Sequence, residues 1–140
     1  MIARLINFIK PYAGWLFIAW FVSILVLSVL PSVGKTTSVD IGKIEIRLDY
    51  LYHIIIYLTG TFLAILWSVG PLKPPYTSLF WRRIALAVAF MILLAVAQEF
   101  IQKLIPSRAF NINDIISNII GVVLGEIITI ILLLRSVRKG

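Results

Sequence analysis

The chain has 140 residues and no cysteine, so disulfides, thiolate chemistry and cysteine-based zinc sites are excluded. Hydrophobic residues make up 61% of it and the mean hydropathy is +1.03, which excludes an ordinary soluble domain, in which roughly 45–50% of residues are apolar. The formal net charge is +7, but the basic residues cluster at the ends of four apolar runs, which indicates membrane topology and anionic lipid rather than nucleic acid.

The first two apolar runs predict membrane-spanning helices. A short basic, amphipathic lead-in at residues 1–10 precedes an uncharged run at residues 11–34, which has the length of a span. A polar loop at residues 35–49 follows, and its mixture of apolar and charged residues is typical of a small hairpin or an interfacial flap. The second predicted span, at residues 50–72, is interrupted only by His53.

The third predicted helix has to include polar residues in order to cross a membrane. Its uncharged part is 15 residues long, whereas a span needs about 20. We therefore expect a helix over residues 79–105, which carries Glu99 and Gln102 into the boundary of the bilayer. The fourth helix is predicted over residues 114–134, with Asp114 as its N-cap.

The distribution of charge predicts the orientation of these helices. The N-terminus, the loop between the second and third helices and the C-terminus together carry eight basic residues and no acid. The eight are Arg4, Lys10, Lys73, Arg82, Arg83, Arg135, Arg138 and Lys139. The other two loops and their flanking helix ends carry five basic and five acidic residues, so the positive-inside rule places both termini in the cytoplasm. The predicted fold is an all-α, polytopic protein of the cytoplasmic membrane, with residues 1–140 forming one domain.

Polar residues gather at the predicted outer ends of helices two, three and four. They are Asp49, His53, Glu99, Gln102, Arg108, Asp114 and Asn118. At about 100° per residue, Asp114 and Asn118 fall on one stripe of the fourth helix. The same stripe contains Gly121 and Gly125, whose G-x-x-x-G spacing allows close approach of another helix. A matching stripe in the second helix runs from its polar outer end to Gly60, so three stripes converge on a polar pocket.

Each of these residues also has a structural interpretation. Asp114 can act simply as a cap, Asn118 as an interhelical hydrogen bond, and His53 as a hydrogen-bonded interior histidine. Their common depth on three helices favours a genuine site, since polar groups inside a membrane are costly unless they are paired or used. Glu126 lies off the Asp114 stripe, and a hydrogen bond to another helix is favoured there over a proton relay.

The combined motifs of helices two to four resemble the signature of VanZ-like membrane proteins. The motifs are Asp49-x-x-x-His53 with Tyr57 and Gly60, then Glu99-x-x-Gln102, Pro106-x-Arg108 and Asp114-x-x-x-Asn118-x-x-Gly121-x-x-x-Gly125. The resemblance covers residues 49–134, and it departs from the family pattern at Tyr50, where the family commonly has Lys, and at Ser107, where Gly is frequent. It implies a small four-helix membrane protein of a family associated with glycopeptide (teicoplanin) resistance and envelope properties, without implying one biochemical activity.

The sequence is compatible with three functions, and it does not decide whether the site is catalytic. The first is binding or processing of an anionic envelope lipid, such as a polyprenyl-linked one, or of its headgroup. The catalytic candidates for that function are His53, Glu99 and Asp114. The ligand-binding candidates are Asp49, Gln102, Arg108 and Asn118, while Gly60, Gly121 and Gly125 are expected to pack helices.

The second and third functions use the same residues differently. A divalent cation is conceivable with ligands from Asp49, His53, Glu99 and Asp114, although these do not form a compact metal motif. The third function is a non-catalytic membrane scaffold, in which the polar cluster only locks the helices together. We expect no cofactor and no nucleic acid partner, and the sequence leaves the oligomeric state open.

Overall fold

The computed structural model describes residues 2–30, 38–41, 44–69, 77–105 and 110–137. Its helices are α1 (Ile2–Ile9), the 3₁₀ turn η1 (Lys10–Tyr12), α2 (Ala13–Val29), α3 (Leu48–Ser68), α4 (Ser78–Lys103) and α5 (Ile112–Val137). Four segments are long and apolar enough to cross a membrane, namely Arg4–Val29, Leu48–Ser68, Ser78–Lys103 and Ile112–Ser136. The predicted all-α fold with four membrane-spanning helices is confirmed.

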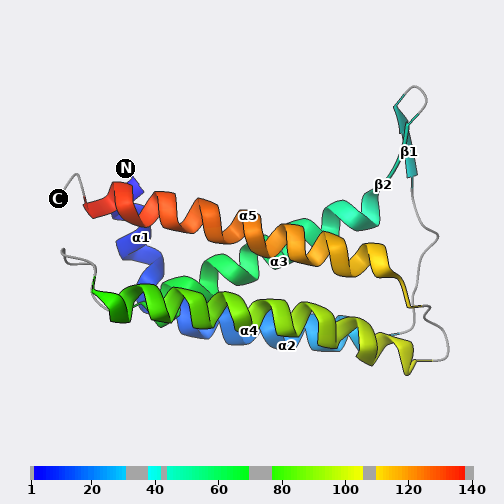
Figure 1. Cartoon of the computed structure of the whole chain (residues 1–140), viewed down its shortest axis with the longest axis horizontal. Helices are drawn as coiled ribbons and strands as arrows, with labels where there is room; N and C mark the ends of the chain where they lie inside the picture. The colour runs from blue at the N-terminus through cyan, green and yellow to red at the C-terminus, as the bar shows by residue number, and fades with distance from the viewer. Residues whose placement is uncertain (1, 31–37, 42–43, 70–76, 106–109, 138–140) are drawn as a thin grey trace.

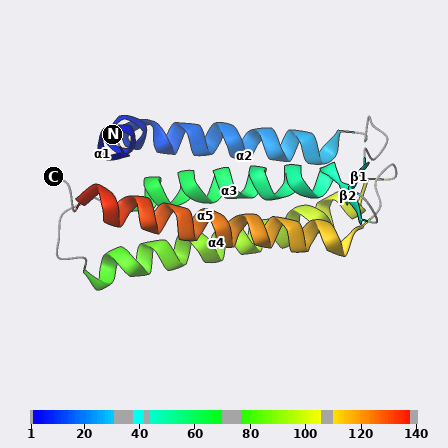
Figure 2. The same ribbon diagram turned by 90° about the horizontal axis from the view of Figure 1, so that it is seen from above.

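Helix α3 is the central element of the bundle. It packs against α2, α4 and α5, and its contact with α5 is the most extensive. Figure 2 shows α3 between α2 on one side and the pair α4 and α5 on the other. Because the spans run alternately in opposite directions, the start of α1 and the end of α5 lie at one end of the bundle (Figure 1). The polar residues lie at the opposite end of the bundle, where α3 and α5 begin and α4 ends.

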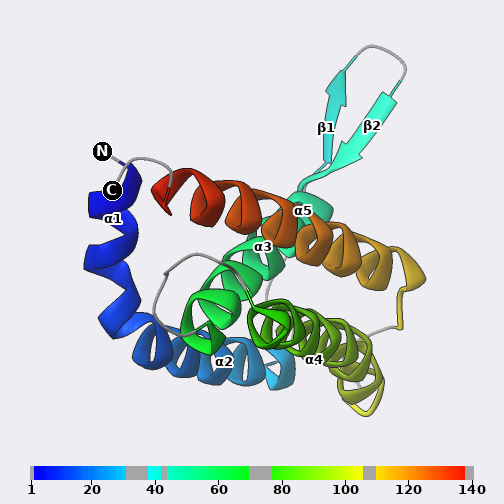
Figure 3. The same cartoon turned by 60° about the vertical axis from the view of Figure 1, so that its left-hand side comes forward.

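The basic lead-in is a helix, so the first helical segment begins at Ile2 and not at Pro11 as predicted. The segment bends at η1, because Pro11 lacks a backbone N–H and its ring disturbs regular α-helical hydrogen bonding. Helix α1 consequently leaves the line of α2 and lies against α5 (Figure 3). Ile6 is part of a buried cluster that includes Leu133, and this apolar burial stabilises the packing of α1 against α5.

The loop before α3 contains a hairpin, which is one of the two structures that its sequence predicts. Strands β1 (Ser38–Ile41) and β2 (Ile44–Arg47) pair antiparallel, with Ile41 opposite Ile44. The hairpin projects beyond the bundle (Figure 3), and β2 leads directly into Leu48, the first residue of α3.

Candidate polar site

The first turn of α5 forms the centre of the polar site. Asn111 caps the helix, because its Oδ1 accepts a hydrogen bond from the backbone N–H of Asn113 at 3.1 Å. Its Nδ2 donates to Asp114 Oδ1 at 2.9 Å. The prediction that Asp114 is the N-cap is therefore wrong, since Asp114 lies inside the first turn and holds the capping side chain in place. Asparagine is a preferred N-cap, so Asn111 itself was the sequence signal for this start.

Glu99 connects the end of α4 to the same cap. Its Oε1 accepts the backbone N–H of Asn111 at 2.7 Å, and the side chain is only 1% exposed. In a capping box this N–H is accepted by a carboxylate three residues into the same helix. Here the carboxylate belongs to a different helix, so one hydrogen bond both completes the cap and fixes α4 relative to α5.

His53 of α3 faces the first two turns of α5. Its Nδ1 lies 2.8 Å from Asn118 Oδ1, and because an amide oxygen only accepts, this contact is a hydrogen bond in the tautomer that carries its hydrogen on Nδ1. Nε2 lies 3.9 Å from Asp114 Oδ2, beyond hydrogen-bonding distance. The His53 and Asp114 side chains are 21% and 14% exposed, so this pair is more accessible than the buried Glu99.

Asn118 uses its side-chain oxygen in the contact with His53, but its side-chain nitrogen has no such contact. The residue is 1% exposed, and its Nδ2 has no hydrogen-bond partner in the described part of the chain. A buried donor without a partner is costly, and native structures contain few of them. This donor lies one helical turn beyond Asp114, beside the His53 ring.

The first turn of α3 also reaches α5. The Tyr50 hydroxyl accepts a hydrogen bond from Asn113 Nδ2 at 3.3 Å, so the residue that replaces the family's usual Lys contacts the start of α5. Asp49 lies in the same turn and is partly buried.

A second set of hydrogen bonds lies deeper, between α3 and α4. The Tyr57 hydroxyl donates to Gln98 Oε1, and it lies 3.4 Å from the Leu94 carbonyl oxygen. Tyr57 is fully buried and packs edge-on against Trp20, with ring centroids 5.9 Å apart. Gln98 is absent from the predicted site residues, although a polar amide beside an apolar run indicates a partner in another helix. Gln102, one turn further along α4, is also buried.

The small residues of the predicted stripes lie where helices cross. A Cβ on Gly121 would overlap the Ile54 carbonyl oxygen, and one on Gly125 would lie 2.7 Å from another backbone oxygen of α3. Helix α5 therefore packs directly against the α3 backbone, next to the polar site. Gly60 faces the other way, and a Cβ there would overlap the indole of Trp20.

The structure thus gathers some of the predicted site residues and leaves others apart. His53, Asp114 and Asn118 form one group, and Glu99 joins it through Asn111. Arg108 lies outside the described residues. The described chain brings together no group of three or more His, Cys, Asp or Glu residues that could hold a metal ion, so the divalent-cation hypothesis gains no support.

Glu126 lies apart from this site. It is partly exposed in the second half of α5. The favoured expectation was a hydrogen bond to another helix, and Glu126 makes none with the described residues.

The comparisons with known proteins agree with the motifs. A family model described as VanZ/LLP1 matches residues 8–134, which include the described polar residues and most of every span. No curated protein and no solved structure matches the chain. The family match and the four candidate spans together make the protein a multi-pass membrane protein. It belongs to the VanZ/LLP1 family.

Proposed function

We propose that the polar site binds the headgroup of an anionic cell-envelope lipid, with His53 as the group that donates a hydrogen bond to it. The observation that carries the proposal is the position of the imidazole. Asn118 lies against Nδ1, whereas Nε2 lies 3.9 Å from Asp114, too far for a hydrogen bond, and the His53 side chain is 21% exposed. A ring that is held on one side and accessible on the other can exchange a proton with a bound group.

We infer that the ligand is a phosphate that keeps one ionisable proton, because the Asp114 carboxylate would repel a fully ionised phosphate. Protonated His53 can donate from Nε2 to an anionic phosphate oxygen, while Asp114 can accept the P–O–H hydrogen of the same group. The α5 N-terminus adds a positive dipole end. The sequence adds Arg108, a bidentate phosphate donor that lies outside the described residues. A polyprenyl phosphate, which is a monoester, fits this pattern, and we infer a role in envelope and antibiotic tolerance at the cytoplasmic membrane.

Lipid binding to the purified protein tests the proposal. The probes are a polyprenyl phosphate and phosphatidylglycerol, with binding measured by native mass spectrometry for His53→Gln and Arg108→Ala. A hydrogen bond to a charged group contributes about 1.5–3 kcal/mol, so each variant should bind polyprenyl phosphate roughly tenfold to a hundredfold more weakly. Arg135→Ala is the matched control, because it removes an exposed arginine from the other end of α5. Unchanged affinity in both site variants would refute the proposal.

A structural role is the second candidate, and the Glu99 hydrogen bond favours it. That carboxylate is buried and accepts a backbone N–H, so it is already used in joining α4 to α5. If the whole cluster only locks helices, Glu99→Gln and His53→Gln, which keep hydrogen-bonding atoms, should both preserve activity in an envelope-tolerance assay. If a proton has to move, His53→Gln should abolish it while the protein remains folded.

A further inference from the structure

A groove lies at the opposite end of the bundle from the polar site. It has a volume of about 340 Å³ and is formed by α2, α3 and α4. That volume is within the range of small-molecule sites, roughly 300–1,000 Å³. Arg83 at one end of the groove is about 24 Å along α4 from Glu99, at 1.5 Å per residue. The groove and the polar site are therefore separate.

Three of the eight residues that line the groove are aromatic. Phe17 is its buried floor, with its ring 5.7 Å from the Trp67 ring and 6.4 Å from the Phe90 ring. The Trp67 indole lies over Gly14, where a Cβ would be 2.9 Å from Nε1. The hydroxyl of Ser68, which also lines the groove, donates to the Ile65 carbonyl at 3.0 Å. The lining therefore offers apolar surface to an occupant, with one exception.

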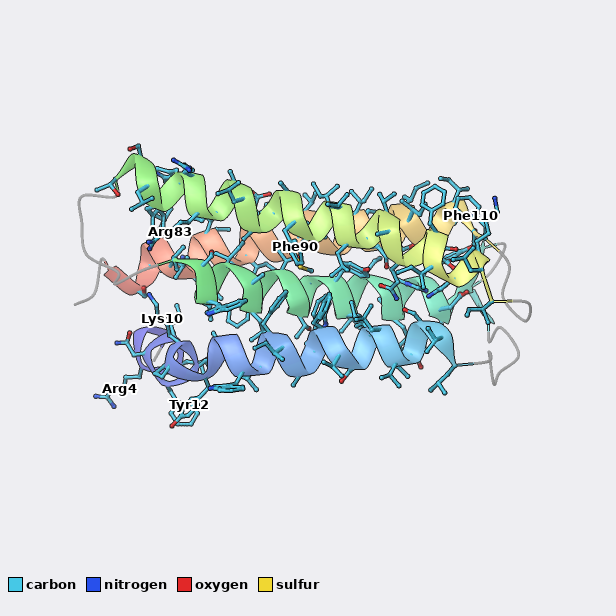
Figure 4. All side chains as sticks on the ribbon, turned by 90° about the horizontal axis from the view of Figure 1, so that it is seen from below. Arg4, Lys10, Tyr12, Arg83, Phe90 and Phe110 are labelled. Atoms are coloured by element: carbon cyan, nitrogen blue, oxygen red, sulfur yellow. The ribbon has the colours of Figure 1, made fainter. Side chains whose placement is uncertain are left out.

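The exception is Arg83. It shares one face of α4 with Ala87 and Phe90, at i, i+4 and i+7, and all three line the groove. Arg83 is partly buried and forms no hydrogen bond or ion pair within the described part of the chain. Figure 4 shows Arg83 near one end of the bundle and Phe90 near its middle. A guanidinium beside an apolar groove within a span requires an anion or a path to the interface.

We propose that this groove holds an acyl chain of an anionic phospholipid and that Arg83 binds its phosphate. The groove lies in a span, where the surrounding medium is acyl chain, and an inserted peptide would leave backbone groups unsatisfied. Arg4 and Lys10 lie at the same end of the bundle (Figure 4), so the positive charge of the protein at this end attracts anionic headgroups. Phosphatidylcholine, which is neutral overall, carries a phosphate too, but its own choline cation competes with Arg83 for that phosphate, so a lipid with net negative charge is preferred.

Quenching of Trp67 fluorescence tests the proposal. The protein is reconstituted with phosphatidylglycerol or phosphatidylcholine that carries dibrominated acyl chains, and the Trp67 contribution is obtained as the difference from Trp67→Phe. We expect phosphatidylglycerol to quench Trp67 more strongly at the same mole fraction. Arg83→Gln should abolish this preference. Arg82→Gln should preserve it, because the neighbouring Arg82 makes the same charge change but does not line the groove.

Two further variants separate the groove from other sources of quenching. Ala87→Leu fills the groove and should reduce quenching by phosphatidylglycerol, whereas Ala85→Leu, on the exposed side of α4, should not. His53→Gln should leave the preference intact, so failure at the polar site and failure at the groove are distinguishable. Equal quenching by the two lipids in the unaltered protein, or a preference that survives Arg83→Gln, would overturn the proposal.

Discussion

At the scale of single residues, the polar end of the bundle has two parts with different burial. Glu99 and Tyr57 are buried, and each hydrogen-bonds to a neighbouring element, so they position helices. His53 and Asp114 are partly exposed and do not reach hydrogen-bonding distance of each other. Asn118 belongs to both parts, because it holds the His53 ring from a buried position.

The contact between His53 and Asn118 predicts a particular histidine tautomer. Because Asn118 presents its carbonyl oxygen, the neutral ring should carry its hydrogen on Nδ1 and leave Nε2 as the acceptor. The chain has one histidine, so ¹⁵N-histidine labelling gives a single ring to follow by NMR. Asn118→Ala should move the population toward the Nε2–H form. A neutral ring in the Nε2–H form in the unaltered protein would contradict the assignment.

The site could be predicted from the sequence only in part. The depth and helical spacing of Asp114 and Asn118 are sufficient to place both residues on one face of their helix. The role of Asn111 was missed because Asp114 is also a good cap, and propensity alone does not decide between two caps three residues apart. The partner of Glu99 is a backbone N–H, a group that every residue except proline has. The sequence therefore carries no signal that identifies this partner.

At the scale of elements, the crossing of α3 and α5 depends on the absence of side chains. Gly121 and Gly125 bring α5 onto backbone oxygens of α3, and between lipid-embedded helices such close packing is a main source of association. The crossing lies beside the contact of His53 with Asn118, so it also sets the distance across the polar site.

The crossing predicts a large difference between two Gly→Ala substitutions. In Gly121→Ala the new methyl meets the Ile54 backbone, which cannot move away without separating the helices. We expect a loss of about 1–3 kcal/mol in the free energy of unfolding, the usual range for overpacking. In Gly14→Ala the methyl meets the exposed Trp67 ring, which can shift, and alanine adds helix propensity of about 1 kcal/mol. That variant should stay within about 1 kcal/mol of the original protein.

The measurement is SDS-induced unfolding in mixed micelles, followed by near-UV circular dichroism. Lipid binding by the polar site should fall with stability in Gly121→Ala and remain unchanged in Gly14→Ala. Equal stability of the two variants would show that the α3–α5 crossing does not depend on Gly121.

At the scale of the whole molecule, the two ends of the bundle differ in chemistry. Figure 1 shows the hairpin and the start of α5 at one end and the α1 helix at the other, and Figure 4 shows Arg83 at the same end as Arg4 and Lys10. The polar site lies at the start of α5, and the groove begins at Arg83. The charge asymmetry of the sequence predicts that the second end faces the cytoplasm.

Cysteine labelling checks this orientation, since the chain has no cysteine of its own. Ser78 and Ile112 are exposed first residues of α4 and α5, at opposite ends of the bundle. A membrane-impermeant maleimide should label Ile112→Cys in intact cells and should label Ser78→Cys only after permeabilisation. Labelling of Ser78→Cys alone in intact cells would reverse the orientation.

Most of the fold could be predicted from the sequence, because lipid requires long apolar helices and hydropathy detects them. The helical lead-in was the exception. Its residues are too few to span a membrane, and although the segment is amphipathic, its contact with α5 has no local sequence signal. The groove was also missed, because it combines Phe17, Trp67 and Arg83 from three helices whose relative rotation the sequence does not specify.

The packing of α1 on α5 has a consequence for biosynthesis. Proteins are made from the N-terminus onward, so Ile6 enters the membrane region long before Leu133 is synthesised. Its burial in that cluster therefore has to wait until α5 has been inserted. The contact joins α1 and α5, the first and last helices of the chain, so it can form only after the other helices have been made. A ribosome-stalled chain that ends before α5 would leave Ile6 without its packing partner Leu133.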